Sequence, residues 1–353
     1  MSRERVLVGL SGGVDSSLAA KLLAGEGYDC VGCTLLLSDS QDVEDARASA
    51  DCLGIPFHVF DFRESFRRQV IEPFISAYEA GRTPNPCIDC NRRLKFGVMF
   101  CRAEELGCRW VATGHYARIE EQNGRFLLKR AADPAKDQTY FLACLTQARL
   151  AHVKFPLGGY TKAEVRQLAR QAGFVNADKK DSQDICFVPG GDYAAVMEAY
   201  TGKSYPAGDY LDQSGNVVGR HRGAVRYTLG QRKGLNLALG SPVYVCAKDM
   251  EKNTVTVGPE SALYSATLRS EGMNWFPFDA PPDGPLRCTV KTRHSQREQP
   301  AAVRPLENGG ALVEFDSPQR AVTPGQAVVL YDGDIVLGGG TIAEALPELP
   351  LGA

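Results

Sequence analysis

A glycine-rich turn near the start of the chain most constrains what it can fold into. Residues 9–17 read Gly-Leu-Ser-Gly-Gly-Val-Asp-Ser-Ser, directly after an apolar run and before a helical apolar pattern. Such a turn between strand and helix lets backbone N–H groups converge on an anion. Ser11, Ser16 and Ser17 add hydroxyl donors, and Asp15 is a candidate magnesium ligand. The stretch therefore predicts a phosphate site.

This turn differs from the common phosphate loop, Gly-x-x-x-x-Gly-Lys-Ser/Thr, because it has no lysine at the corresponding place. Its Ser-Gly-Gly-x-Asp-Ser order resembles the pyrophosphate loop (PP-loop) of the ATP pyrophosphatase superfamily. The resemblance implies cleavage of ATP between the alpha and beta phosphates, with AMP left on an acceptor oxygen. An ordinary tight turn is the alternative, but the strand–loop–helix context favours phosphate.

Strand and helix patterns alternate over the first part of the chain. Strands are predicted at 6–10, 30–37, 57–60 and 110–113, and helices at 16–25, 42–53, 64–79 and 91–106. This alternation predicts an α/β domain with a doubly wound parallel sheet, and the PP-loop resemblance implies an adenine nucleotide alpha-hydrolase-like fold. Ligands of such sheets bind at the carboxyl ends of the strands, where the glycine turn and residues 113–116 lie.

The pattern of predicted elements changes along the rest of the chain. A hairpin is predicted around Asn123-Gly124, followed by helices at 138–145 and 161–171, the second starting with a capping box. After residue 200, glycine, proline and short β-rich runs dominate: 217–218, 242–246, 255–257, 286–292, 311–315 and 327–331. We expect a PP-loop domain at 1–200, a small mixed central domain at 201–268 and a C-terminal β-barrel at 269–353. A link with few periodic positions is expected near 265–280.

Bulk composition narrows the setting. No apolar run approaches the roughly 18 residues of a membrane span, and no signal peptide is evident, which predicts a cytoplasmic protein without a membrane partner. The 11 cysteines predict reduced thiols. Cysteines expected in the core are Cys30, Cys33, Cys52, Cys101, Cys108, Cys144, Cys246 and Cys288. Net charge is −2, so RNA binding needs local patches. Candidate patches are Arg92-Arg93-x-Lys95, Lys179-Lys180, Arg220-His221-Arg222 with Arg226, Arg232-Lys233, and Lys291-x-Arg293-His294 with Arg297.

Two segments carry cysteines that look chemical. Cys87 and Cys90 form a Cys-x-x-Cys pair in a proline-stiffened loop just before a predicted helix. A thiol near a helix N-terminus has a lowered pKa, so we expect reactive thiolates there. Cys186 follows two lysines and several polar side chains in a second segment. The alternatives are an inert buried thiol for Cys186 and zinc for the pair, although two further zinc ligands are missing nearby.

Read together, the motifs resemble the tRNA-specific 2-thiouridylase (MnmA) family over nearly the whole chain. The matching segments are 9–17, Gly81–Pro86, Ala112–Tyr116, Lys136–Phe141, Lys180–Phe187, Tyr227–Gly234 and Thr323–Gln326. Their joint order makes chance implausible. The resemblance implies a tRNA-uridine 2-sulfurtransferase that thiolates the wobble uridine of tRNA, bound by its anticodon arm, and that uses ATP and Mg²⁺.

The resemblance also implies a mechanism. AMP transfer to the base oxygen makes it a good leaving group, while the loop stabilises departing pyrophosphate. Cys186 would carry sulfur as a persulfide, received from a cysteine desulfurase or a sulfur-relay protein. Cys90 would then attack as the nucleophilic second thiol, either releasing sulfide or helping to transfer the sulfur. A Cys90–Cys186 disulfide would form, and reductant would reopen it. The base must leave its stack, which costs about a few kcal/mol and less in a single-stranded loop.

Site residues follow from the same resemblance. Positions matching ATP contacts are Gly9, Leu10, Ser11, Gly12, Gly13, Val14, Asp15, Ser16, Leu35 and Gly114. Positions matching tRNA contacts are Asn85, Pro86, Cys87, His115, Lys136, Asp137, Gln138, Arg293, His294 and Gln326. The barrel is expected to hold the anticodon arm by shape and phosphate rather than by base edges.

One position departs from the family pattern and leaves the sulfur chemistry open. Many members have an aspartate where this chain has Cys87, and Asp89 stands two residues later. Cys87, Cys90 and Cys186 are therefore also candidate ligands of a [4Fe–4S] cluster with one iron open to carry sulfur. An amide-forming PP-loop ATP pyrophosphatase would need no reactive cysteines and no basic β-rich C-terminal half. A non-catalytic RNA-binding module would not need the intact glycine turn.

Overall fold

Five parallel strands form the sheet of the N-terminal domain in this computed structural model, which describes residues 3–179 and 185–346. The strands are β1 (Arg5–Gly9), β2 (Asp29–Leu36), β3 (Phe57–Asp61), β4 (Trp110–Ala112) and β7 (Val153–Lys154). Their order is β3-β2-β1-β4-β7, so the chain leaves β1 first to one side and then to the other. The doubly wound sheet predicted from the sequence is confirmed, with its switch point at the end of β1.

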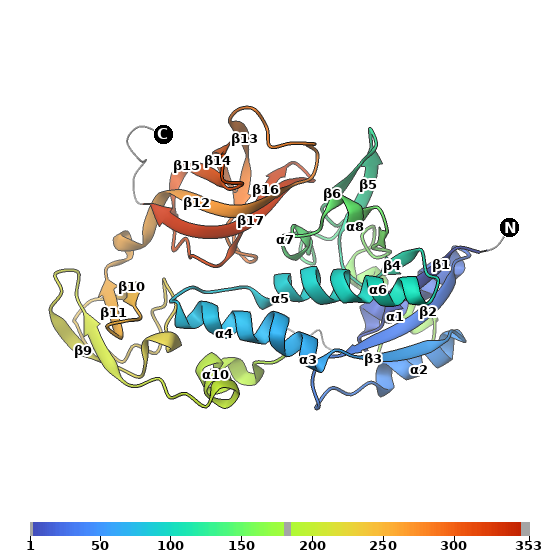
Figure 1. The fold of residues 1–353 in the computed structure, drawn as a ribbon, viewed down its shortest axis with the longest axis horizontal. Helices are drawn as coiled ribbons and strands as arrows, with labels where there is room; N and C mark the ends of the chain where they lie inside the picture. The colour runs from blue at the N-terminus through green and yellow to red at the C-terminus, as the bar shows by residue number, and fades with distance from the viewer. Residues whose placement is uncertain (1–2, 180–184, 347–353) are drawn as a thin grey trace.

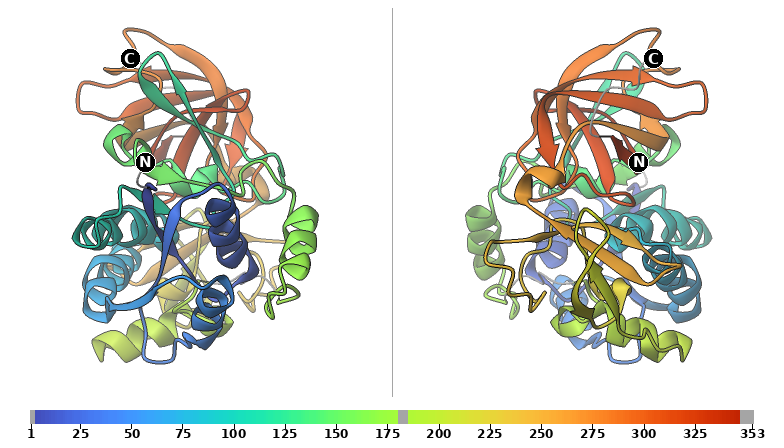
Figure 2. Two further views of the ribbon diagram at one scale, coloured as in Figure 1. Left: turned by 90° about the vertical axis from the view of Figure 1, so that its right-hand side faces the viewer. Right: turned by 90° about the vertical axis from the view of Figure 1, so that its left-hand side faces the viewer.

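Helices cover both faces of this sheet (Figures 1 and 2). Along β1, Val6 and Val8 face a cluster with residues of α1 (Val14–Gly25) and α2 (Glu44–Leu53), whereas Leu7 faces α6 (Met99–Glu105). Alternate residues of a strand point to opposite faces, so an unbroken apolar run is what a strand buried on both sides needs. The shorter helices are α7 (Thr139–Leu142), α8 (Gln147–Leu150), α9 (Lys162–Gln171) and α10 (Tyr193–Thr201).

Two long helical stretches run between the sheet and the central domain (Figure 1). The first joins α3 (Arg63–Phe66), a π-helical turn and α4 (Glu72–Glu79). The second joins α5 (Pro86–Asp89), the π-helical segment Cys90–Val98 and α6. The prediction of a helix starting at 91 is wrong, because Asn85 accepts a hydrogen bond from the Cys87 N–H (3.2 Å) and starts the helix at Pro86. Cys87 and Cys90 thus lie within a helical stretch and not in a loop.

The predicted hairpin is confirmed as β5 (Arg118–Gln122) and β6 (Arg125–Lys129). Asn123 and Gly124 both have positive φ, at 52° and 76°, as a two-residue hairpin turn requires. The hairpin belongs to the sheet of the C-terminal barrel, because Lys129 pairs with Ile335. This pairing fastens the N-terminal domain to the barrel.

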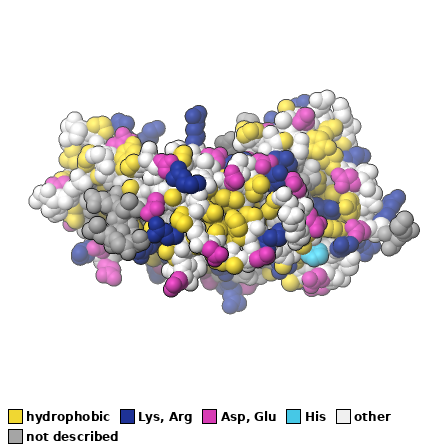
Figure 3. All heavy atoms as spheres, turned by 90° about the horizontal axis from the view of Figure 1, so that it is seen from above, with side chains coloured by type: hydrophobic (Ala, Val, Ile, Leu, Met, Phe, Trp, Pro, Cys, Tyr) yellow, Lys and Arg dark blue, Asp and Glu magenta, His cyan; other side chains and the backbone are white. Residues whose placement is uncertain are grey.

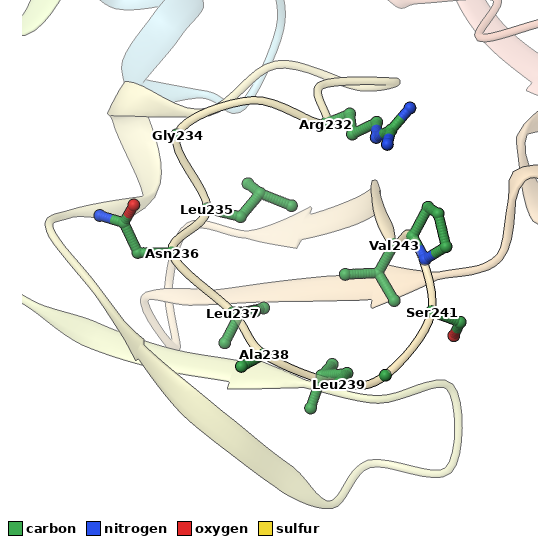
Figure 4. A pocket seen from close by; sticks show the side chains of 11 residues that line it. Arg232, Gly234, Leu235, Asn236, Leu237, Ala238, Leu239, Ser241 and Val243 are labelled. Carbon is green, nitrogen blue, oxygen red and sulfur yellow. The ribbon is translucent and has the colours of Figure 1, made fainter.

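The central domain is a four-stranded sheet in the order β10-β11-β8-β9. Its strands are β8 (Gly208–Leu211), β9 (Val217–His221), β10 (Tyr244–Asp249) and β11 (Thr254–Gly258). Figure 4 shows the loop before β10, whose Leu235, Leu237 and Val243 line a shallow pocket. His221 is buried beneath this domain's aromatic rings, so its place in a predicted surface patch is wrong.

The C-terminal barrel is confirmed. Its strands are β12 (Tyr264–Trp275), β13 (Leu286–Lys291), β14 (Gln299–Pro305), β15 (Ala311–Arg320), β16 (Ala327–Asp332) and β17 (Ile335–Leu346). Strand β12 pairs with both β15 and β17, which closes the barrel. The link expected near 265–280 is wrong, because most of that stretch is β12. Its inward positions include polar Thr267 and Ser270, which hid the apolar alternation of a strand.

Two further observations concern the bulk predictions. Cys52 and Cys101 are exposed on α2 and α6, so their assignment to the core is wrong; Cys30, Cys33 and Cys108 are buried as predicted. Both exposed cysteines occupy the outer faces of helices whose inner faces cover the sheet. No helix in the described parts of the chain is long and apolar enough to cross a membrane.

Candidate active site

The glycine turn after β1 presents free backbone donors. Gly12 has a φ of 74°, and Gly13 precedes α1 without any side-chain cap on the helix. The first N–H groups of α1 are therefore available to an anion. Ser16 Oγ accepts from the Ser11 N–H (3.1 Å) and donates to the Gly13 carbonyl (3.0 Å), which holds the turn closed. This geometry fits the phosphate chain of ATP.

Several predicted nucleotide contacts reach the turn only through their backbone. The side chains of Leu10 and Val14 are buried, and the Leu10 N–H donates to Cys33. A Cβ on Gly114 would lie 2.7 Å from the backbone of the turn, and one on Gly9 would meet Met99. Glycine at position 114 thus permits the loop after β4 to touch the loop after β1.

Ser17 has a structural role instead of the predicted phosphate contact. It is fully buried and donates to Ser49 Oγ (2.8 Å). Asn176 Nδ2 links this pair to the turn, because it donates to the Gly12 carbonyl and to Ser17 Oγ, both at 3.1 Å. The sequence carried no signal for Asn176, because it stands more than 150 residues after the turn that it supports.

A lysine beside the turn comes from a distant helix. Lys162 Nζ lies 2.7 and 2.8 Å from the two carboxylate oxygens of Asp15, and Tyr116 Oη donates to the same carboxylate (2.8 Å). Lys162 opens α9 directly after its capping residue, Thr161, with Glu164 completing the predicted capping box. The cation missing from the turn's own sequence is therefore supplied by α9. A magnesium ion bound at Asp15 would have to share the carboxylate with Lys162.

The thiol cluster, defined as Cys87, Cys90 and Cys186, is the second part of the site. Cys90 belongs to a buried apolar cluster against which Ile185 and Phe187 pack, so the residues on both sides of Cys186 contact the cluster that contains Cys90. The Phe187 ring makes edge-on contacts with two phenylalanines of α3 and α4, at centroid distances of 5.6 and 5.2 Å. All three thiols are near enough to interact electrostatically. Residues 180–184 of the motif lie outside the described residues.

Burial sets the acidity of these thiols. It raises the pKa of Cys90 to about 11 and also raises the pKa of Cys87 and Cys186. The expectation of lowered pKa values is wrong, since desolvation is the largest effect at all three thiols and outweighs their position near the start of the helical stretch. The positive charge of Lys95 opposes the rise at all three sulfurs. All 11 cysteines are free thiols.

Asp89 stands beside the thiol cluster. Burial raises the pKa of its carboxyl group, while Arg92 and Arg93 lower it, and Arg93 Nε lies 3.6 Å away. Asp89 faces Cys90 and also Cys144, whose Sγ donates to the Ile88 carbonyl (3.7 Å). Within the described residues, no group of three His, Cys, Asp or Glu side chains is placed to hold a metal ion.

The turn and the thiol cluster lie on the same rim of the sheet. Leu35, at the end of β2, packs against the core of the sheet and also against the buried apolar cluster that contains Cys90. His115 follows β4 next to Gly114, and its Nδ1 is 2.7 Å from Thr113 Oγ1. Burial and then the Lys95 charge hold the pKa of His115 well below its ordinary value, so the ring is neutral. His115 is thus a buried neighbour of Lys95 rather than an exposed cation.

Most residues predicted to contact tRNA lie along the seam between the N-terminal domain and the barrel. Gln326 Nε2 donates to the Thr83 carbonyl (2.8 Å), which joins the barrel to the loop that holds Asn85 and Pro86. The His294 ring lies 4.4 Å from that of Phe141. The seam therefore borders the thiol cluster.

Several of these side chains already have protein partners. Arg293 donates to the carbonyls of Leu229 and Ala321 and to Thr323. Asp137 is buried and accepts from the Ala131 N–H and Thr139 Oγ1, next to Lys136, and Gln138 accepts from the Tyr116 N–H. Figure 3 shows basic and acidic side chains interspersed over the face seen from above. Charge alone does not mark an RNA surface on that face.

Family models cover most of the chain in three parts. Residues 4–190 match a tRNA methyl transferase HUP domain, residues 195–259 a tRNA methyl transferase PRC-barrel domain, and residues 265–342 an aminomethyltransferase beta-barrel domain. A weaker likeness is to a 4-thiouridine synthetase–RNA complex with bound ATP, at a TM-score of 0.38 and 21% identity over 52% of this chain and 44% of that one. The assignment does not depend on it.

Full-length relatives are similar throughout. A tRNA-specific 2-thiouridylase MnmA of Acetivibrio thermocellus is 46% identical over 97% of this chain and 100% of its own length. One from Moorella thermoacetica is 47% identical over 95% and 98%. With a PP-loop-type turn, a thiol cluster on the same rim and this similarity from end to end, the chain belongs to the tRNA-specific 2-thiouridylase family.

Proposed function

We propose that this protein is an ATP-dependent tRNA-uridine 2-sulfurtransferase that acts on the wobble uridine. The observation that carries the proposal is the position of two parts on one rim of the sheet: the uncapped turn before α1 and the thiol cluster. The first part suits transfer of AMP to the base, and the second suits delivery of sulfur to the activated carbon. An amide-forming relative would have no use for the second.

The proposed reaction has two stages: AMP is transferred to the base oxygen, and sulfur then replaces that oxygen. The uridine O2 attacks the alpha phosphorus of ATP, the bond to the beta phosphate breaks, and pyrophosphate leaves. The terminal sulfur of a Cys186 persulfide then attacks C2, and AMP departs with the former base oxygen. Cys90 attacks Sγ of Cys186, which leaves sulfur on the base and forms a Cys90–Cys186 disulfide. A thiol reductant supplies the two electrons that reopen it.

Charge at the turn supports the first stage. The free N–H groups of α1 and the Lys162 ammonium face the region where negative charge accumulates on pyrophosphate. Magnesium would neutralise phosphate charge when bound, held by the nucleotide and at most partly by Asp15. Gly12 and Gly13 let the phosphates approach the backbone closely.

The persulfide route is preferred to the iron–sulfur alternative. A cluster needs three thiolates arranged around one iron–sulfur core, and the described residues contain no such metal-binding group. A buried Cys90 and an exposed Cys186 suit the persulfide route, in which the exposed thiol is loaded with sulfur and the buried thiol resolves it. Anaerobic reconstitution tests the alternative: bound iron with absorbance near 400 nm in wild type, lost on removing Cys87, would favour a cluster.

Two macromolecular partners follow from this proposal. The tRNA anticodon arm is placed along the seam, with its flipped uridine reaching Asn85, Pro86 and Cys87. A cysteine desulfurase or a sulfur-relay protein loads Cys186, which reaches the surface. We place the protein in the cytoplasm, where reductants keep thiols reduced.

Mass spectrometry of tRNA nucleosides tests the whole proposal. Wild type is incubated with tRNA, ATP, magnesium and a sulfide or persulfide source and compared with Cys186→Ser and Cys90→Ser. We expect 2-thiouridine only with wild type and with the control Cys101→Ser, whose thiol is exposed on α6 away from the cluster. Full modification by both active-site variants would overturn the assigned roles of the cysteines.

A further inference from the structure

A second lysine, Lys179, lies beside the glycine turn. Its Nζ forms an ion pair with Asp45 Oδ2 at 2.5 Å, although the two residues are 134 positions apart in the chain. Asp45 belongs to the first turn of α2. A Cβ on Gly12 would lie 3.1 Å from the Asp45 Cβ, so Asp45 packs directly against the glycine turn. The ion pair therefore lies at the edge of the phosphate site.

Hydrogen bonds behind the turn fix the backbone on both sides of this ion pair. The Lys179 N–H donates to the Asn176 carbonyl, and Asn176 Nδ2 donates to the Gly12 carbonyl, both at 3.1 Å. Ser49 Oγ donates to the Asp45 carbonyl (2.8 Å) and lies 3.5 Å from Asn176 Nδ2. The two backbones are thus held against the turn, whereas the two side chains extend from them towards solvent.

The ion pair itself is easily exchanged. The side chains of Lys179 and Asp45 are 54% and 43% exposed. Ion pairs this exposed contribute little to stability, because solvent screens the charges and two side chains lose freedom. Within residues 3–179 and 185–346, neither side chain has a second hydrogen bond or ion pair. A phosphate chain on the turn carries several negative charges, so it competes well with one carboxylate for the ammonium.

We propose that Lys179 is a further phosphate-binding residue, which leaves Asp45 when the phosphate chain of ATP occupies the glycine turn. This inference rests on the proposed function only for the binding of ATP at the turn. No covalent bond changes: the ammonium exchanges a carboxylate oxygen for a phosphate oxygen. Residues 9–17 contain no lysine or arginine, so Lys179 and Lys162 both bring positive charge to the turn from distant parts of the chain.

Neutralisation of Asp45 is the alternative role for Lys179. In that case the loss of Lys179 weakens ATP binding only because an unpaired carboxylate remains beside the phosphates. The two roles differ once residue 45 carries no charge. A lysine that contacts phosphate still contributes to ATP binding in the Asp45→Asn background, whereas a lysine that only neutralises Asp45 does not.

The test is a double-mutant cycle for ATP affinity, measured by calorimetric titration with magnesium and without tRNA. We expect Lys179→Met to raise the Kd for ATP roughly tenfold, as the loss of one charge-assisted hydrogen bond does. Asp45→Asn should lower the Kd, because it frees Lys179 and removes a negative charge. In the Asp45→Asn background, Lys179→Met should still raise the Kd roughly tenfold. An effect of Lys179→Met that disappears in this background would overturn the proposal.

Arg170→Met is the matched control. Arg170 on α9 pairs with Asp178 at 2.6 Å, directly before Lys179, and both side chains are exposed. The variant removes a positive charge from the same part of the domain and should leave the Kd for ATP unchanged. A loss equal to that of Lys179→Met would show a general effect of charge and would overturn the proposal. Should Lys179→Met not fold, Lys179→Gln, which keeps a polar side chain, replaces it with the same expected results.

Failure of this inference and failure of the proposed function are distinguishable. If wild type thiolates no tRNA but the cycle gives the expected losses, the proposed function fails and the role of Lys179 stands. If wild type thiolates tRNA and Lys179→Met binds ATP with the wild-type Kd, the role of Lys179 fails alone. A wild type that binds no ATP would overturn both.

Discussion

Removing the ammonium of Lys162 should weaken ATP binding. The loss should exceed that caused by a side-chain substitution within the glycine turn that leaves the backbone conformation unchanged. In the wild type, Lys162 Nζ lies 2.7 and 2.8 Å from the two carboxylate oxygens of Asp15. Lys162→Met leaves this carboxylate without its cationic partner next to the phosphates, although the Tyr116 hydroxyl still donates to it. A unit charge about 5 Å from another contributes roughly 3 kcal/mol at an effective dielectric of about 20. The Asp15 side chain is 30% exposed, so solvent screening reduces this value.

The expected result is a dissociation constant for ATP on the order of 10–100 times higher, measured by calorimetric titration without tRNA. The double variant Lys162→Met with Asp15→Asn should recover part of the loss, because the unpaired negative charge is gone. Lys203→Met, which breaks the more exposed ion pair with Glu79, is the matched control and should bind ATP normally. Unchanged ATP affinity in a folded Lys162→Met protein would refute the reasoning.

Three further outcomes are expected. Gly114→Ala should reduce ATP affinity and destabilise the fold by about 1–3 kcal/mol, since its Cβ would lie 2.7 Å from backbone, whereas Gly159→Ala meets nothing within 4 Å; equal melting temperatures would contradict this. Gln326→Ala should remove about 1 kcal/mol from the docking of the barrel on Thr83 and lower tRNA thiolation while ATP titrations stay unchanged. Because the folded pKa of Cys90 is raised to about 11 from an ordinary value of 9.0, its contribution to stability is present below pH 9 and is lost as pH rises towards 11. The melting temperature of the wild type should therefore fall more steeply with pH over that range than the melting temperature of Cys90→Ala. Equal slopes would show that Cys90 ionises as easily in the folded state as in the unfolded state.

Local patterns predicted the scaffold well. Strand β1 was placed within one residue, because an apolar run ending at glycine has few other interpretations. The Asn123-Gly124 turn and the capping box at Thr161 were also correct, since each is specified by neighbouring residues. Strand β12 was missed because barrel closure buries hydroxyl side chains there, such as Ser270, which bonds to Ala311 across the sheet.

The sequence located the segments that carry the candidate cysteines, but it did not predict the electrostatics of the site. Cys90 was expected to be acidic because a proline-rich segment precedes a helix, whereas the fold buries it and raises its pKa. Burial of Cys90 depends on the apolar cluster around it, and part of that cluster's packing comes from Phe187, almost one hundred residues later. No local pattern reports that environment.

The sequence alone determined the phosphate turn, the α/β order of the first domain and the family, and it singled out the candidate cysteines, because each depends on adjacent residues or on motif order. Only the tertiary structure decided that Lys162 supplies the missing cation, that Asn176 supports the turn, and that burial raises the pKa of Cys90. Charge interactions and burial act through space between residues far apart in the chain. They exist only once the parallel sheet has brought its carboxyl ends, and the segments that follow them, onto one rim.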